Sequence, residues 1–537
     1  MTRTPILGLL ALALTIGLSF TSISNKAVAA GKLVVFNVGN GAEPKTIDPH
    51  KIEGVPEHHI TENLFEPLVS QHPTTLKPVP GGAESWQISK DKKVYTFKLR
   101  KNQKWSNGEP VTAKDYVYGW TRLLEPKTAA DYAYYGYYFK NGRAYNKGEL
   151  KDASQLGFKA IDDYTVQVTL EQPTAYFLGL LYHQALHPVH RATIEKFGDR
   201  WVRPENMVSN GPFMLDKWET NKVLTVKKNP YYWDKDTVKL DVVNFYPIDN
   251  LDTEEKMFRT GQLHKTNEIP LEKIPFWQKD KTGVFHSVPL SGTYYYDFNV
   301  NRAPLKDKRI RKALTLAVDR GKLVKFVTKG NQLPASTFVP PGTGPDGYKS
   351  PKSWIPTDSS GFPEAKKLLA EAGFPGGKGF PALEILYNTH EGHKKLAEAI
   401  QQMWKENLGI EAKLVNQEWK VFIDSRTKHD FQVARDGWFT DYADPNGFLD
   451  ILTSGVMTNN PGWSNKEYDA LLKQGGIEQN PKKRNAILAQ AEALILEEVP
   501  VMPLYVYTRN FLLDKKVQNW PINLQENEML KYVSLKE

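Results

Sequence analysis

The 537-residue chain contains no cysteine, and this absence limits how it can be stabilised. Disulfides, thiol nucleophiles and cysteine-ligated zinc or iron–sulfur sites are all excluded. A chain of about 500 residues can still bury several sufficient hydrophobic cores, and its length suggests roughly two to four domains. We therefore expect a multidomain protein that is held together by packing alone.

The first thirty residues have the pattern of an export signal. Arg3 precedes an apolar run from Ile6 to Leu18, and small residues follow as far as Ala30. This order is typical of a secretory signal peptide, and the apolar run is shorter than the roughly 20 residues of a membrane span. Residues 1–30 are therefore predicted to be a signal peptide. Because no cysteine is present to carry a lipid anchor, the mature chain is expected to be free in the periplasm.

Charge and aromatic content give contrasting information about partners. The formal net charge is +9, but the lysines and arginines are spread along the chain, which argues against a nucleic-acid partner. The 13 Trp, 25 Tyr and 24 Phe residues exceed what a core usually requires. Aromatic side chains commonly line clefts that hold flexible organic ligands, so the composition favours a binding cleft.

Strand and helix patterns alternate along most of the sequence, which predicts a mixed α/β fold. Residues 94–100 alternate like a strand, and residues 112–123 have helical spacing. Ser464 and Glu467 predict a capping box at the start of a later helix. Capping residues predict two further helix starts, at Asp307 and Asn480, and a helix end at Gly409.

The segment 388–450 is the strongest candidate for a ligand site in this pattern. It is expected to run helix, strand, strand and then a turn-rich stretch. The second strand ends in Gly437 and Trp438, and the carboxylate of Asp441 follows before the turn at Asp444. Open α/β sheets bind ligands at the carboxyl ends of their strands, so these side chains are predicted to lie at a binding cleft.

No catalytic or cofactor motif is evident. The chain lacks a G-x-S-x-G elbow and a phosphate-binding glycine loop. The pairs His187/His190 and His390/His393 could each share a helical face, but neither has the H-E-x-x-H form of a zinc protease, so no metal is predicted. The two carboxylates of a glycosidase need only meet in space, so a glycan hydrolase stays open at this point.

Several short motifs follow one another in a consistent order. They are Ala-Glu-Ser-Trp at 83–86, Trp-Ser-Asn-Gly-Glu-Pro at 105–110, Asn-Gly-Pro-Phe at 210–213, Asn-Pro-Tyr-Tyr-Trp at 229–233, Gly-Thr-Tyr-Tyr-Tyr-Asp at 292–297, Asn-Gln-Glu-Trp at 416–419 and Ala-Arg-Asp-Gly-Trp at 434–438. This series resembles the extracellular solute-binding proteins of peptide transporters. The likeness extends from residue 47 to the end of the chain.

The resemblance implies a periplasmic binding protein fold. Two mixed α/β lobes would be joined by a two-strand hinge, and an extra lobe would be inserted in the first. Carried onto this chain, the first cleft lobe would comprise 31–65, 190–290 and 509–537, the extra lobe 66–189, and the second cleft lobe 291–508. A chain that crosses twice between lobes makes a hinge that can close on a ligand.

The resemblance also implies the residues that meet a peptide. Asp441 matches an aspartate that pairs with the peptide ammonium, and Arg435 and His393 match cationic groups that meet carboxylates. From local sequence alone, Asp441 as a residue that forms the turn before Asp444 is the minor alternative. Further matched cleft positions are Trp419, Trp438, Tyr132 and Tyr295 as aromatic walls, and Glu53, Asp297, Arg426, Val55 and Gly437, the last two through backbone groups.

One departure from the family pattern affects the cleft. Related proteins carry a disulfide at positions matching Gly292 and Phe439, which this chain cannot form. The side chain of Phe439 is expected to add bulk near the cleft and to narrow one pocket.

These points predict a monomeric receptor, not an enzyme, that holds short peptides for an inner-membrane ABC importer. Main-chain pairing would let it accept varied sequences, because every peptide offers the same N–H and C=O groups. A murein-peptide receptor of the same fold is the nearest alternative, although that branch has Ser where Gly437 stands. A secreted peptide or glycan hydrolase is the alternative from a different class.

Overall fold

The computed structural model describes residues 33–174, 176–343, 347–440, 442, 444–478 and 480–536. The predicted signal peptide at 1–30 and the predicted ligand residue Asp441 lie outside these residues. Among the described residues, no helix is long and apolar enough to cross a membrane. The sheets all belong to the unit Val34–Glu537.

One four-stranded sheet combines distant segments of the chain. Its order is β1 (Val35–Gly39), β10 (Val242–Tyr246), β9 (Val223–Lys228) and β8 (Phe213–Glu219). β1 runs parallel to β10, and the other neighbours are antiparallel. Alternate residues such as Phe36 and Val38 enter a core with Ile60 of α1 (Val55–Leu64) and with Leu530. Segments near both ends of the described chain therefore pack into one hydrophobic core.

A second four-stranded sheet lies entirely within residues 66–189. Its antiparallel order is β4 (Ala83–Ile88), β5 (Val94–Leu99), β7 (Thr165–Thr169) and β6 (Phe158–Asp162). α2 (Ala113–Leu124) starts at a capping box between Thr112 and Asp115, and its Trp120 enters the core below the sheet. The predicted strand at 94–100 and helix at 112–123 are thus confirmed to within one residue.

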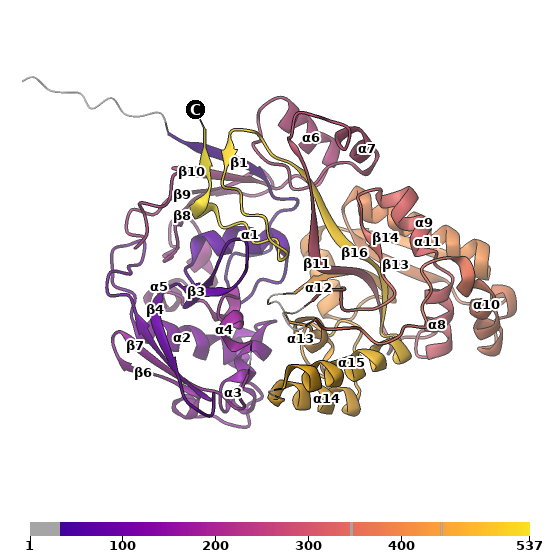
Figure 1. Ribbon diagram of the computed structural model, residues 1–537, viewed down its shortest axis with the longest axis horizontal. Helices are drawn as coiled ribbons and strands as arrows, with labels where there is room; N and C mark the ends of the chain where they lie inside the picture. Colours follow the sequence, from indigo (N-terminus) through magenta and orange to yellow (C-terminus); the bar gives the residue numbers. More distant parts are fainter. Residues whose placement is uncertain are drawn as a thin grey trace, which may run out of the picture. The chain divides into compact units, whose positions relative to one another are not determined.

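The largest sheet is mixed and has six strands. Its order is β12 (Leu333–Pro334), β16 (Val501–Leu512), β11 (Phe285–Phe298), β15 (Val433–Phe439), β13 (Leu383–Asn388) and β14 (Ala412–Gln417). Alternation along β11 sends Tyr294 and Tyr296 into one core and Tyr295 into another. α8 (Lys308–Leu316), α10 (Phe362–Glu371) and α11 (Glu391–Leu408) supply the first core, and α14 (Lys466–Ile477) and α15 (Pro481–Glu498) supply the second (Figure 1).

The two longest strands, β11 and β16, run side by side and pair over most of their length (Figure 1). The register shifts between Pro289 and Thr293. Both predicted lobe crossings, at 290/291 and at 508/509, fall within these strands. Each of the three larger sheets draws its strands mainly from one predicted lobe, while the exact lobe bounds stay a prediction.

Two local predictions from the sequence were wrong. The helix α12 (Trp419–Thr427) stands where the sequence suggested a direct passage between strands, because the Glu418 side chain accepts the Lys420 N–H and caps it. The predicted capping box at Ser464 does not form. Asn465 caps α14 instead, since its Oδ1 accepts the N–H groups of Glu467 and Tyr468. The predicted caps at Asp307, Gly409 and Asn480 are confirmed.

Shorter elements connect these layers. They are β2 (Val69–Gln71), β3 (Pro78–Pro80), α3 (Gly142–Asn146), α4 (Phe177–Leu180), α5 (Arg191–Phe197), α6 (Leu251–Arg259), α7 (Ile274–Trp277), α9 (Arg320–Lys322), α13 (Asn446–Leu449), β17 (Val517–Gln518) and β18 (Ser534–Leu535).

Candidate ligand-binding cleft

A cavity of about 220 Å³ lies where segments from both predicted cleft lobes meet. Its walls come mainly from residues within 40–56, 267–295, 388–396, 419–426, 435–439 and 505–510. Aromatic and charged side chains both contribute to the lining. A concave site of mixed character that lies between lobes is a usual place for an organic ligand.

Strand β15 presents one unpaired edge to this cavity. On one side it pairs with β11 along its whole length. On the other side β13 pairs only with Val433 and Ala434, so no described strand pairs with this edge at residues 435–439. These five residues all line the cavity. An extended ligand can form main-chain hydrogen bonds at such an edge.

Side chains of β15 alternate between the two faces of the strand, so each face has its own set of neighbouring side chains. Arg435 stands opposite Tyr296 of β11, whereas Asp436 stands opposite Tyr295. Residues directly opposite in an antiparallel pair share a face. The guanidinium of Arg435 and the carboxylate of Asp436 therefore lie on opposite faces of one strand.

The Arg435 face offers a cation without a counter-ion. Nη2 of Arg435 donates to the Tyr507 hydroxyl over 3.0 Å, and Nη1 donates to Asn388 Oδ1 over 3.4 Å. Nε has no partner, and no carboxylate of the described residues forms a salt bridge with this guanidinium. Burial and the nearby Arg435 hold the pKa of His393 well below its usual range, so this imidazole is neutral. No described carboxylate bonds this guanidinium directly, so it can supply donors to the carboxylate of a ligand.

The opposite face gathers three carboxylates round one guanidinium. Nη2 of Arg426 donates to Glu53 Oε1 over 2.6 Å, and Nη1 donates to Asp436 Oδ1. Burial, and then the neighbouring Asp436, raise the pKa of Asp297 well above its usual range. Burial likewise raises the pKa of Glu53, although Arg426 opposes this effect. Three carboxylates surround this guanidinium, and the charge of Lys45 also acts on Glu53.

Trp419 closes one side of the cleft at the start of α12. Its Nε1–H donates to Glu57 Oε1 on α1 over 3.1 Å. The ring also covers Gly54, where any side chain would collide with it. The Trp419 ring therefore joins the two predicted cleft lobes and bounds the cavity.

A smaller cavity of about 90 Å³ adjoins the first and shares Glu53, Val55 and Trp438 with it. Tyr132 lines this smaller space, with its ring centroid 6.3 Å from that of Trp438 and 4.5 Å from that of His183. The ligand space thus extends into a second compartment walled by rings.

Most residues that the sequence singled out come together here. Ten of them line the larger cavity: Arg435, His393, Trp419, Trp438, Tyr295, Glu53, Val55, Gly437, Arg426 and Phe439. Tyr132 lines the smaller cavity, and Asp297 is buried beside Asp436 without lining either. Asp441 lies outside the described residues, so its role as ammonium partner stays a prediction.

Sequence reasoning missed several residues of the cleft. Asp436 was quoted within a motif but was given no role, although strand alternation places it on the face opposite Arg435. Glu57 carried no signal, because its contact with Trp419 joins segments far apart in the chain. Glu268 also carried no signal in the sequence, although it lines the cavity and its carboxylate lies 3.3 Å from His390 Nε2. Long-range pairs of this kind leave no local pattern.

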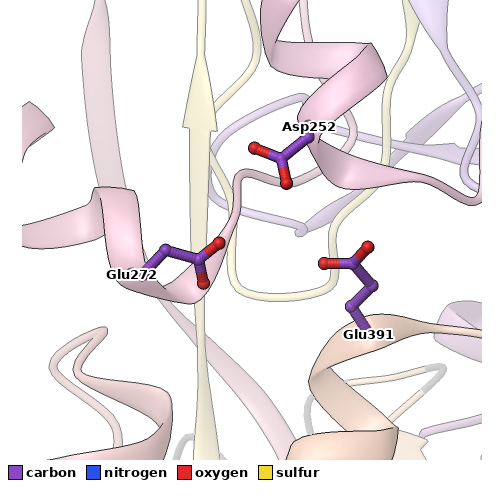
Figure 2. Close-up of side chains that lie close together, drawn as sticks. All are labelled: Asp252, Glu272 and Glu391. Carbon is purple, nitrogen blue, oxygen red and sulfur yellow. The ribbon is translucent and has the colours of Figure 1, made fainter.

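Three other carboxylates converge near this region. Asp252 and Glu272 approach Glu391 at the start of α11 (Figure 2). Lys273 Nζ lies 2.6 Å from Asp252, and Lys395 Nζ lies 2.6 Å from Glu272. These two lysines offset part of the negative charge of the three carboxylates.

The histidine pairs have structural partners. His187 Nε2 lies 2.9 Å from the Tyr182 carbonyl oxygen, and His190 caps α5. His390 caps α11, with its ring centroid 4.3 Å from that of His393. Each pair is therefore engaged in capping or packing.

Comparison with known proteins agrees with this geometry. The profile described as bacterial extracellular solute-binding proteins, family 5 middle, matches residues 77–460. The chain is 40% identical over 479 residues to the periplasmic oligopeptide-binding protein OppA of Salmonella typhimurium, which covers 87% of this chain and 86% of that protein.

Two solved structures extend the comparison. OppA of Haemophilus influenzae in complex with the peptide RPPGFSPFR superposes with a TM-score of 0.90 at 35% identity, over 94% of this chain and 99% of that one. The unliganded open form of the periplasmic murein tripeptide-binding protein MppA gives a TM-score of 0.65 at 36% identity, over 94% and 98% of the two chains.

These likenesses agree with the sheets and with the position of the cleft. The fold is that of periplasmic binding proteins, with two mixed α/β lobes, a two-strand hinge and an extra inserted lobe. The profile matches most of the chain, and the OppA relative is 40% identical over 87% of it. These two findings assign the chain to a family. The chain belongs to family 5 of the bacterial extracellular solute-binding proteins.

Proposed function

We propose that this protein is the substrate-binding receptor of a peptide ABC importer and encloses short peptides between its lobes. The observation that carries the proposal is the guanidinium of Arg435, which bonds no carboxylate of the described residues and lies beside the unpaired edge of β15. An extended peptide brings both missing components. Its main chain pairs with the strand edge, and its carboxylate meets the guanidinium.

This arrangement explains how varied sequences are accepted. The main-chain groups and terminal charges are the same in every unblocked peptide. Side chains then project into the two adjoining cavities, where bridging waters adapt to their size. Asp441 follows β15 in the sequence and would receive the ammonium group at the other end of the ligand.

The proposed role is binding without catalysis. The relatives are named as binding proteins, and the described lining of the larger cavity contains neither serine nor cysteine. We place the mature protein in the periplasm as a monomer exported by its first thirty residues. It would pass its ligand intact to inner-membrane permease subunits. The relative that binds murein tripeptide makes murein peptides an alternative cargo.

Calorimetry with trialanine and with its C-terminal amide tests the proposal. The amide should bind about 100-fold more weakly or worse, because it leaves Arg435 without an anion. In Arg435→Gln the two ligands should bind with similar affinity. Arg191→Gln, which removes an exposed arginine of α5, should retain the difference.

Equal binding of the acid and the amide by the wild-type protein would contradict the assignment of Arg435. Mass spectrometry of the recovered ligand completes the test. Intact trialanine is expected, and cleavage to alanine would favour a hydrolase.

A further inference from the structure

Two short surface segments expose both apolar and basic side chains. The first is 276–281, at the end of α7 and just after it. The second is 322–333, which contains the short helix Leu323–Thr328 and the start of β12. Nε2 of Gln278 lies 3.5 Å from the carbonyl oxygen of Lys329, so the two segments adjoin. They form one region of the molecular surface, which we call the basic–aromatic surface.

Three large apolar side chains of this surface are open to solvent. Phe276 is 65% exposed, and Phe326 and Leu333 are each 58% exposed. They are three of the four most exposed large apolar side chains among the described residues, and the fourth, Leu33, stands at the start of the described chain. Single exposed apolar residues are common on soluble proteins, whereas a group of them marks contact with a partner.

Lysines accompany these apolar side chains. The two segments contain five lysines and one acidic residue, Asp280, which gives them a formal charge of +4. Nζ of Lys325 lies 5.1 Å from the centroid of the Phe326 ring, so charge and apolar area are adjacent. Four of the lysines are exposed and form no salt bridge within the described part of the chain: Lys279, Lys281, Lys325 and Lys329. The surface therefore presents positive charge that no neighbouring carboxylate offsets.

An anionic membrane surface matches both features. Its headgroups attract lysines, and its interface accepts phenylalanine and leucine side chains at the boundary with the acyl chains. A lysine can keep its ammonium group among the headgroups while its stem follows an apolar neighbour. An acidic protein segment or a nucleic acid would meet the lysines but would leave the phenylalanines in water.

We propose that the basic–aromatic surface binds anionic lipid headgroups and holds the protein reversibly at a membrane. This interaction goes beyond the proposed peptide-binding function and does not depend on it. The contact is peripheral, with the phenylalanines at the interface and the lysines among the headgroups. Each lysine near an anionic surface contributes roughly fivefold to partitioning, so four unpaired lysines are enough for weak, reversible binding.

Co-sedimentation of the mature protein with lipid vesicles tests the proposal. Vesicles of equal parts phosphatidylcholine and phosphatidylglycerol are compared with vesicles of phosphatidylcholine alone. The anionic vesicles should bind at least about tenfold more protein, and the excess should disappear when salt is raised from about 0.1 M to about 1 M. Equal binding to both kinds of vesicle, or binding to neither, would overturn the proposal and leave the surface to a protein partner.

A pair of charge reversals locates the contact. Lys279→Glu combined with Lys325→Glu should lower binding to the anionic vesicles about tenfold or more. The matched control combines Lys90→Glu with Lys151→Glu, two exposed lysines of the predicted extra lobe, and makes the same change in net charge. Its effect should stay below about threefold, because charges remote from the membrane are screened. Equal losses in both double variants would show a response to net charge alone and would overturn the assignment to this surface.

Removal of the rings tests the apolar part of the contact. Phe276→Ser combined with Phe326→Ser keeps every charge and should still weaken binding to the anionic vesicles about tenfold, because the apolar area is lost from the interface. Binding as strong as that of the wild type would contradict a surface that uses both features. All of these side chains are exposed, so the urea midpoints of the variants should match that of the wild type.

Discussion

Glu57 on α1 accepts a hydrogen bond of 3.1 Å from the indole of Trp419 at the start of α12, across 362 residues of sequence. The carboxyl group is 1% exposed, and its other oxygen has no partner among the described residues. Burial raises the pKa of Glu57 from 4.5 to about 7. This contact links segments of the two predicted cleft lobes.

The first prediction concerns the pH dependence of stability. The folded protein holds a proton on Glu57 between pH 4.5 and about 7, where the unfolded chain has lost it. The stabilising contribution is therefore complete below pH 4.5 and is lost as pH rises to about 7. Relative to Glu57→Gln, the wild-type free energy of unfolding should fall by up to roughly 3 kcal/mol over this range. Urea denaturation of both proteins from pH 4.5 to 7.5 measures the difference. A constant difference would show that the carboxyl stays ionised.

The second prediction concerns Asp441. If it receives the peptide ammonium, Asp441→Ala should cost about 3–5 kcal/mol of binding, or roughly 200- to 5000-fold in affinity. N-acetylation of the ligand removes the same interaction, so the two changes should be strongly non-additive. Calorimetry on the four combinations of protein and ligand decides this. Additive losses would mean that Asp441 shapes the turn and that another carboxylate meets the ammonium.

The third prediction concerns the pairing of Gly292 with Phe439 across β11 and β15. The Phe439 ring occupies the space of a side chain at position 292 and lies 4.5 Å from the Tyr507 ring. Gly292→Ala should therefore destabilise the protein by about 1–3 kcal/mol through overpacking. Gly476→Ala is the matched control. This helical glycine has nothing near its side-chain position, so alanine should stabilise α14 by about 0.5–1 kcal/mol. Urea midpoints that shift in the same direction would contradict the overpacking argument.

The fourth prediction concerns closure of the lobes. The chain superposes better on a peptide complex than on an unliganded open form, with TM-scores of 0.90 and 0.65. A ligand that binds both lobes favours the closed state. Small-angle scattering should give a smaller radius of gyration with a tripeptide than without it, after bound ligand has been removed by unfolding and refolding. An unchanged radius, with binding verified by calorimetry, would argue against a moving hinge at β11 and β16.

Local patterns in the sequence predicted much of the secondary structure. The alternation at 94–100 and the caps at Asp307 and Gly409 were read correctly, because each depends on residues a few positions apart. The helix α12 was not predicted. This helix has only nine residues, and its cap at Glu418 is an uncommon one.

The cleft was predicted mainly through resemblance to a family, since composition alone indicated only a cleft with aromatic walls. Ten of the named residues do line one cavity. The resemblance did not indicate that carboxylates gather around Arg426, because Asp436 and Asp297 acquire their environment from each other and from Arg426. Asp297 was expected at the cleft surface, and the structure places it behind that surface.

By itself the sequence determined the α/β class, the absence of disulfides, several helix ends and the motifs that carry the family likeness. These properties depend on residue type and short spacing, which the chain states directly. Only the tertiary structure decided that Arg435 bonds no carboxylate among the described residues, that Glu53 and Asp436 share Arg426, and that Glu57 bonds Trp419. Charge balance and burial depend on which distant segments meet. The free energy of a charged group follows from its neighbours and its access to water, not from its position in the chain.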